Sequence, residues 1–80
     1  RIQKKKLTFK LSGEIYIDDN ELKTVKVLSN NYNEMILTYE KDKLNIGQII
    51  NYITKQNVKI IDMSTDDGDL EDVFVTLTNN

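Results

Sequence analysis

Apolar and polar residues alternate near the start of the chain, from Leu7 to Ser12, where every second side chain is apolar. Strict alternation places the apolar side chains on one face of an extended chain, so this stretch predicts a half-buried strand. Shorter stretches of the same kind follow at Val25–Val27 and Met35–Tyr39. Between them, Asn30–Asn33 is rich in asparagine, which tolerates positive φ in turns, so we expect these two strands to form an antiparallel hairpin.

Helical spacing replaces this alternation after Asn45. Asn45 is suited to the N-cap position, and Gln48 stands three residues later, where its side chain can return a capping-box hydrogen bond. The apolar positions that follow lie on one stripe of a helix: Ile46, Ile49, Ile50 and Ile53. We therefore expect a helix that runs to about Gln56 and buries this stripe.

A fourth strand is predicted at Val58–Met63, beyond that helix. Its pattern is mixed, because Ile60 and Ile61 are adjacent, and a mixed pattern is typical of a strand whose two faces are both partly covered. The polar stretch Ser64–Gly68 then predicts a loop.

The connection between the first and second strands has no long periodic pattern. Within Glu14–Lys23 we expect a short helix at Asp19–Lys23. In the alternative, Glu14–Ile17 forms an extra strand and that helix is absent.

The last segment of the chain, Asp69–Thr78, has the pattern of an amphipathic helix. Asp69 is suited to the N-cap, and Glu71 and Asp72 follow in the first turn, where the helix dipole favours negative charge. The apolar residues fall at i, i+3, i+4 and i+7: Leu70, Val73, Phe74 and Leu77. A helix this short is marginal in water, so we expect its apolar stripe to be buried against a neighbour.

In chain order, the expected elements are strand, short helix, strand, strand, helix, strand and helix. This order predicts an α+β fold of ferredoxin-like type, with a four-stranded, largely antiparallel sheet, helices on one face and an added C-terminal helix. Residues 1–80 are expected to form a single small domain. Residues 1–6 are a basic lead-in, interpreted as a solvated linker or strand edge, and residues 69–78 form the closing helix.

The composition excludes most forms of catalysis. The sequence has no Cys and no His, which excludes disulfides, thiolate and imidazole catalysis, and metal sites built from these ligands. Its three glycines, Gly13, Gly47 and Gly68, are too dispersed to form a phosphate-binding loop. We therefore expect no enzymatic activity and no cofactor in this chain by itself.

The charge pattern argues against several kinds of ligand. A net charge of -2 gives no reason to expect attraction to nucleic acid or to an anionic bilayer, and no apolar run is long enough to insert into a membrane. An acidic cluster near the end of the chain suggests calcium: Asp62, Asp66, Asp67, Asp69, Glu71 and Asp72. Placing Gly68 at the sixth position of an EF-hand loop, however, puts Met63, which has no side-chain oxygen, at the first, so a calcium site is not expected.

Two functions of ferredoxin-like sheets also fit poorly. RNA-recognition domains stack bases on sheet aromatics, whereas Phe9 aligns with the core positions of its strand, and Tyr39 is the one other aromatic on a predicted strand. An acylphosphatase-like enzyme needs an arginine in an anion-binding loop, and Arg1 is the sole arginine of the chain. We interpret the tyrosines outside the strands as boundary residues.

The closing segment carries a family resemblance. Leu70–Phe74, which reads Leu-Glu-Asp-Val-Phe, and the following Val75–Thr78 resemble the closing motif of the ATP-binding subunits of ABC transporters of the drug and bacteriocin exporter type. The whole chain is similar to the small accessory domain that follows the ATPase core in those subunits. Gly68-Asp69 stand where the family often has Pro-Ser, and Asp can replace Ser as a helix cap.

The resemblance implies a regulatory or assembly role. It implies an upstream ATPase core that binds ATP and Mg²⁺ and hydrolyses ATP, a second ATPase subunit, and a membrane permease that holds the complex at the cytoplasmic face of the membrane. The expected contact residues are those of the motif: Leu70, Glu71, Asp72, Val73, Phe74 and Leu77. In one form of this hypothesis the apolar stripe docks within the domain, and Glu71, Asp72 and Thr76 face a partner. The alternative function is a ferredoxin-like module that senses a small molecule.

Overall fold

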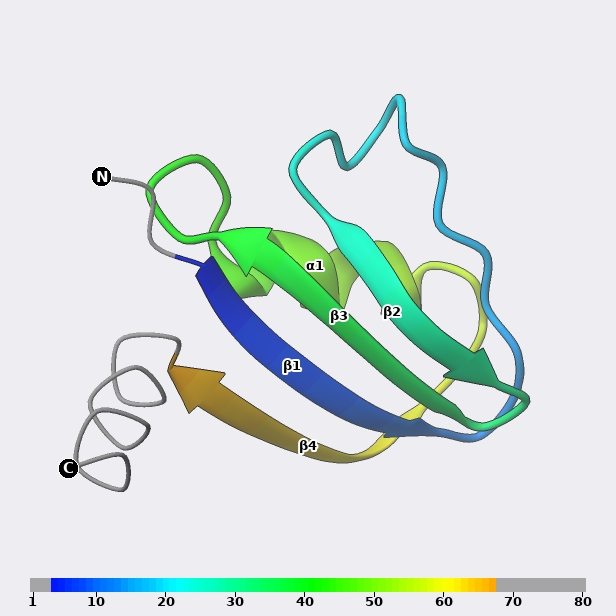
Figure 1. The fold of residues 1–80 in the computed structure, drawn as a ribbon. Coiled ribbons are helices and arrows are strands. Elements are labelled where there is room, and N and C mark those ends of the chain that lie inside the picture. Colours follow the sequence, from blue (N-terminus) through cyan, green and yellow to red (C-terminus); the bar gives the residue numbers. More distant parts are fainter. Residues whose placement is uncertain (1–3, 68–80) are drawn as a thin grey trace, which may run out of the picture.

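The structure, a computed structural model, describes residues 4–67 and contains one sheet and one helix in that range. The elements are β1 (Lys4–Leu11), β2 (Lys26–Asn31), β3 (Glu34–Glu40), α1 (Ile46–Thr54) and β4 (Ile60–Asp67). The strands lie in the order β2-β3-β1-β4, and each neighbouring pair is antiparallel (Figure 1). The predicted α+β class and the four-stranded antiparallel sheet are therefore confirmed.

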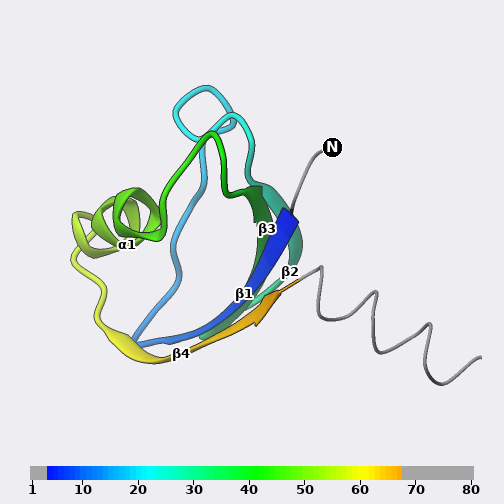
Figure 2. The ribbon, with the colours of Figure 1, turned by 90° about the vertical axis from the view of Figure 1, so that its left-hand side faces the viewer.

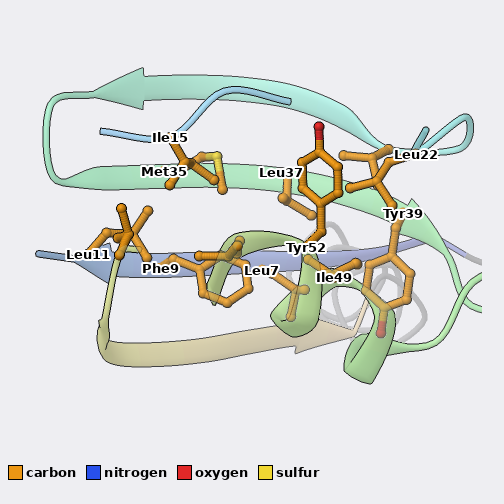
Figure 3. Packing of buried hydrophobic residues seen from close by; sticks show 13 residues of the cluster. Leu7, Phe9, Leu11, Ile15, Leu22, Met35, Leu37, Tyr39, Ile49 and Tyr52 are labelled. Carbon is orange, nitrogen blue, oxygen red and sulfur yellow. The ribbon is translucent and has the colours of Figure 1, made fainter. Parts of the chain in front are cut away.

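The inner face of the sheet carries the core. Leu7 of β1 lies opposite Leu37 of β3, and Phe9 lies opposite Met35, so the alternating apolar positions of the two central strands meet on one face (Figure 3). All four side chains are fully buried, together with Ile49 and Ile53 of α1. The sequence predicted this arrangement because a strand with one covered face alternates between apolar and polar residues.

The outer face of the sheet is polar. α1 and the 12–25 connection both lie on the opposite side, as Figure 2 shows. On the outer face Lys10 of β1 lies between Glu34 of β3 and Asp62 of β4, and Lys6 lies opposite Asp66. Opposite charges on neighbouring strands favour this register by about 0.2–1 kcal/mol per pair.

Each edge strand contains one irregularity. The register shifts at Leu28 in β2 and at Ile61 in β4, so neither residue has a partner in the neighbouring strand. Both side chains are exposed, by 51% and 65%. The bulge in β4 explains why Ile61, which sequence patterning places in a strand, does not reach the core.

The helix begins as the sequence predicts. The Asn45 side chain accepts a hydrogen bond of 2.9 Å from the Gln48 backbone N–H, and the Gln48 side chain accepts one of 3.0 Å from the Asn45 N–H, which completes the capping box. Gly47 leaves room for this cap, because a Cβ there would lie 3.2 Å from the Asn45 Oδ1 atom. The helix ends at Thr54, two residues before the predicted Gln56.

The prediction of a short helix at Asp19–Lys23 is wrong. The chain makes a single turn there, in which the Glu21 and Leu22 N–H groups donate to the Asp18 carbonyl over 3.0 and 3.1 Å. The alternative strand at Glu14–Ile17 is also absent, since these residues form an irregular connection. One turn holds too few apolar residues to support a helix, and the connection is fixed instead by a few side chains buried in the core: Ile15, Leu22 and Val25.

The fourth strand is shifted relative to its prediction. β4 starts at Ile60 and continues to Asp67, so the expected loop at Ser64–Gly68 is wrong for its first four residues. The polar end of β4 pairs with the basic start of β1, with Lys6 opposite Asp66. Pairing with β1 therefore extends a strand whose own sequence does not favour one.

The hairpin turn also differs in detail from the expectation. Tyr32, and not one of the asparagines around it, has positive φ, at 42°. The hairpin itself is confirmed, because β2 and β3 pair antiparallel with Asn31 opposite Glu34.

The predicted closing helix at residues 69–78 lies outside the described residues. Within residues 4–67, α1 spans nine residues and is therefore too short to cross a membrane.

Candidate interaction surfaces beside the helix

The predicted contact residues cannot be placed relative to the sheet. They are Leu70, Glu71, Asp72, Val73, Phe74 and Leu77, and all of them lie outside residues 4–67. The structure does give the point at which their segment leaves the described part. That point is Asp67, the last residue of β4, which lies opposite Lys5 at the start of β1.

One flank of α1 is closed by the 12–25 connection. Tyr52 projects from this flank beside Leu22, and its hydroxyl oxygen accepts a hydrogen bond of 2.9 Å from the Asp18 backbone N–H (Figure 3). Tyr52 and Leu22 are both buried. The turn at Asp18 is held in shape by its own carboxylate, which accepts from the Asn20 N–H over 2.9 Å.

Gln56 ties the same connection to the end of the helix. Its Oε1 atom accepts a hydrogen bond of 3.0 Å from the Tyr16 backbone N–H, and its Nε2 atom donates to the Tyr16 carbonyl over 2.9 Å. Nε2 also lies 3.3 Å from the Tyr52 carbonyl, to which it donates. A single amide side chain therefore satisfies both backbone groups of a residue in an otherwise irregular segment, 40 positions away in the sequence.

A shallow polar depression lies on this closed flank. It is lined by residues of the turn and of α1: Glu21, Leu22, Gln48, Asn51, Tyr52 and Lys55. The Lys55 ammonium lies 4.8 Å from the centre of the Tyr52 ring, which is the geometry of a cation–π contact. The depression thus combines a cation, a carboxylate and two amides around one aromatic ring.

The surroundings of Tyr52 change the pKa of its phenol. The Asp18 backbone N–H, which donates to the phenolic oxygen, lowers the pKa of Tyr52, but burial and the carboxylates of Glu21 and Asp18 outweigh it and raise that pKa above its ordinary value of 10.0. At neutral pH Tyr52 is therefore an uncharged side chain that seals the flank. Burial likewise raises the pKa of Tyr39, against the opposing charge of Lys41.

The opposite flank of α1 has no such cover within the described residues. An open apolar depression lies between the C-terminal half of α1 and the start of β4, lined by Ile50, Thr54, Asn57, Val58, Lys59 and Ile60. Ile50 and Ile60 are half-buried, in contrast to Ile49 and Ile53 on the same helix. Ile46, one turn before Ile50, is also half-buried.

The acidic and aromatic residues for which a calcium or RNA site was considered can now be placed. Asp62 and Asp66 are both on the outer face of β4, where each lies opposite a lysine of β1, and residues 4–67 contain no cluster of three or more acidic side chains that could hold a metal ion. Phe9 and Tyr39 are core residues, as expected for aromatics on the inner face.

Sequence patterning placed Tyr16, Tyr32 and Tyr52 at the domain boundary. This is correct for Tyr16 and Tyr32, which are 77% and 69% exposed, and wrong for Tyr52, which is buried. The sequence does contain a signal for Tyr52, because it follows Ile49 by three residues and so extends the buried stripe to one side.

Comparison with known proteins identifies no relative. The sequence matches no protein-family model, and neither a curated protein nor a solved structure is significantly similar to it.

Proposed function

We propose that this domain acts through contacts with other proteins and carries out no chemistry of its own. The observation that supports this best is the position of the closing motif. Two residues separate it from β4, an edge strand of the sheet, so the segment predicted to meet partners leaves the described part at the border of the domain. The polar outer face of the sheet, with its alternating lysine and acidic side chains, offers a second surface that is suited to a charged partner.

In its specific form, the proposal is that the chain is the C-terminal assembly or regulatory domain of the ATP-binding subunit of an ABC exporter. It rests on the resemblance of Leu70–Thr78 to the closing motif of such subunits. The partners would be the ATPase core of the same chain, a second ATPase subunit and the membrane permease, at the cytoplasmic face of the membrane. ATP and Mg²⁺ would be bound by the core and not by this domain.

The proposal extends to the fold type, which would be ferredoxin-like with the first helix replaced by an irregular connection. The strand order supports this. β3 lies between β1 and β2, and β4 pairs with the free side of β1, which is the split β-α-β arrangement of that fold. α1 would then correspond to the second helix of the fold.

The test uses the complete ATP-binding subunit, co-expressed with its permease. Replacing Glu71 and Asp72 by lysine reverses the charge that we expect to face the partner, and should lower the amount of co-purified permease by about tenfold, the scale of one lost charge contact. The control also introduces two lysines, but beyond the motif, as Asn79→Lys with Asn80→Lys, and it changes the charge by half as much because asparagine is neutral. Normal permease recovery with Glu71→Lys and Asp72→Lys would contradict the exporter proposal.

The polar depression on the closed flank favours a second candidate function, the sensing of a small molecule. Tyr52, Lys55 and Glu21 place an aromatic ring and both signs of charge together, which is suited to a zwitterionic or aromatic ligand. A thermal-shift screen with amino acids and nucleotides tests this. A shift that disappears in Lys55→Ala would favour sensing over the assembly role.

A further inference from the structure

The unequal cover of the two flanks of α1 leaves an apolar surface without an occupant among the described residues. We call this surface the open flank and define it by four residues that line the depression, Ile50, Thr54, Val58 and Ile60, together with Ile46, the half-buried residue one turn before Ile50 on α1. Its isoleucines are half-buried, so each still has apolar area that a further element could remove from water, at about 25 cal/mol per Å².

We propose that the chain's own segment Leu70–Leu77 covers the open flank, packed as a helix parallel to α1. The spacing of the two rows of side chains is the first reason. Ile46, Ile50 and Thr54 follow one another at four-residue steps on α1, or about 6 Å per step. The predicted stripe has nearly the same steps, so Leu70 would meet Ile46, Phe74 would meet Ile50 and Leu77 would meet Thr54.

The direction of the chain is the second reason. β4 ends at Asp67 opposite Lys5, and β3 ends at Glu40 opposite Lys4, so both strands finish at the same end of the sheet. The chain passes from Glu40 to the start of α1 at that end. A segment that reverses after Asp67 therefore starts beside Ile46 and runs in the direction of α1.

The length of the chain agrees with this path. Gly68 and Asp69 separate the end of β4 from Leu70, and two residues are enough to reverse the chain when one of them is a glycine. From Leu70 to Leu77 a helix rises by about 10 Å, against about 12 Å from Ile46 to Thr54. The segment is therefore long enough to cover most of the row from Ile46 to Thr54 on α1.

Charge complementarity is the third reason. The first turn of the segment holds Asp69, Glu71 and Asp72. The loop that leads into α1 carries the exposed Lys41 and Lys43 with the exposed Asp42 between them, so its net charge is positive. The Lys43 N–H donates to the Glu40 carbonyl over 3.0 Å, which keeps this loop at the same end of the sheet. The acidic turn would thus lie beside a loop of net positive charge, with its apolar stripe turned toward α1.

This inference concerns packing within the domain and does not depend on the exporter proposal. If both hold, Leu70, Val73, Phe74 and Leu77 are buried in the same chain, and Glu71 and Asp72 remain for a partner. A failure of the permease test would leave the packing untouched, and a failure of the packing test would leave the permease result standing.

Two-dimensional nuclear Overhauser spectroscopy on the unmodified 80-residue chain is the first test. We expect cross-peaks between the Phe74 ring and the Ile50 methyl groups, with intensities that do not change on dilution. Absence of these cross-peaks would overturn the proposal. Cross-peaks that vanish on dilution would overturn it too, because they would place the segment of a second copy on this surface.

Disulfide trapping is the second test, and it is clean because the chain has no cysteine of its own. Under mild oxidation, Ile50→Cys with Phe74→Cys should form an intramolecular bond about tenfold faster than the control, Asn51→Cys with Phe74→Cys, because their Cβ atoms would lie within bonding reach. Asn51 is exposed and lies on the closed flank. Equal rates for the two pairs would contradict the predicted register.

Discussion

The two flanks of α1 differ in how far other segments cover them within the described residues. On the closed flank, Tyr52 and Gln56 bind an irregular connection through side-chain hydrogen bonds to its backbone. On the open flank, isoleucines stand half-buried beside β4, and no described segment covers them. The closed flank shows what an irregular segment needs in order to cover a helix: its backbone N–H and carbonyl groups must find polar partners.

The largest loss of stability is expected from Leu22→Ala, which removes a buried side chain from the closed flank. Leu22 is only 5% exposed, so the change should lower the free energy of unfolding by about 2–4 kcal/mol through lost burial and an unfilled cavity. Urea denaturation measures this. The matched control is Leu28→Ala, at the exposed bulge of β2, which should change stability little. Equal losses in the two variants would show that the connection does not seal this flank.

A smaller effect is expected from Gln56→Ala, which removes the anchor of Tyr16. The backbone N–H and carbonyl of Tyr16 would both lose their partner, at a cost of about 1–2 kcal/mol in unfolding free energy. Hydrogen exchange should show faster exchange of the Tyr16 amide than of amides in β1. Gln56→Glu is the informative second variant, since it keeps the acceptor for the N–H but loses the donor to the carbonyl. If the Tyr16 amide were as well protected in Gln56→Glu as in the unmodified chain, the hydrogen bond that Gln56 donates to the Tyr16 carbonyl would add nothing to stability.

The smallest loss of stability at neutral pH is expected from Tyr52→Phe, and the size of this loss depends on pH. The variant leaves the Asp18 N–H without its acceptor, which should cost about 1 kcal/mol at pH 7. The folded state raises the pKa of Tyr52 above 10.0, so the stability that the neutral phenol contributes is present below pH 10.0 and is lost as the pH rises past that value. Phenylalanine cannot ionise, so the difference between the two chains should narrow in alkali.

Urea midpoints measured from pH 7 to pH 11 provide the check on this narrowing. Tyr32→Phe serves as the control, because Tyr32 is exposed in the hairpin turn and outside the core. A constant difference between Tyr52→Phe and the unmodified chain across this range would show that the phenol of Tyr52 does not couple ionisation to folding.

Local patterns were enough to predict much of this fold. The alternation at Leu7–Leu11 and at Met35–Tyr39 predicts the central strands because an inner face of alternate apolar residues is all that they need. The capping box at Asn45 and Gln48 predicts the start of α1 because both of its hydrogen bonds are made within four residues.

The features that local patterns missed depend on residues far apart in the sequence. Pairing with Lys6 extends β4 through Asp66, and the sequence of β4 alone contains no sign of it. The bridge from Gln56 to Tyr16 joins residues on either side of the hairpin, and neither side chain marks a turn or a cap. The closing segment, which supplies the predicted contact residues, lies outside the described residues and stays a prediction.

The bulges at Leu28 and Ile61 affect whether the sheets of neighbouring copies can pair edge to edge. Both outer strands of the described sheet are interrupted, so neither presents a long straight ribbon of unpaired amides to another molecule. Many copies of such a domain can be held close together, as in a multisubunit complex, without their sheets merging into fibrils.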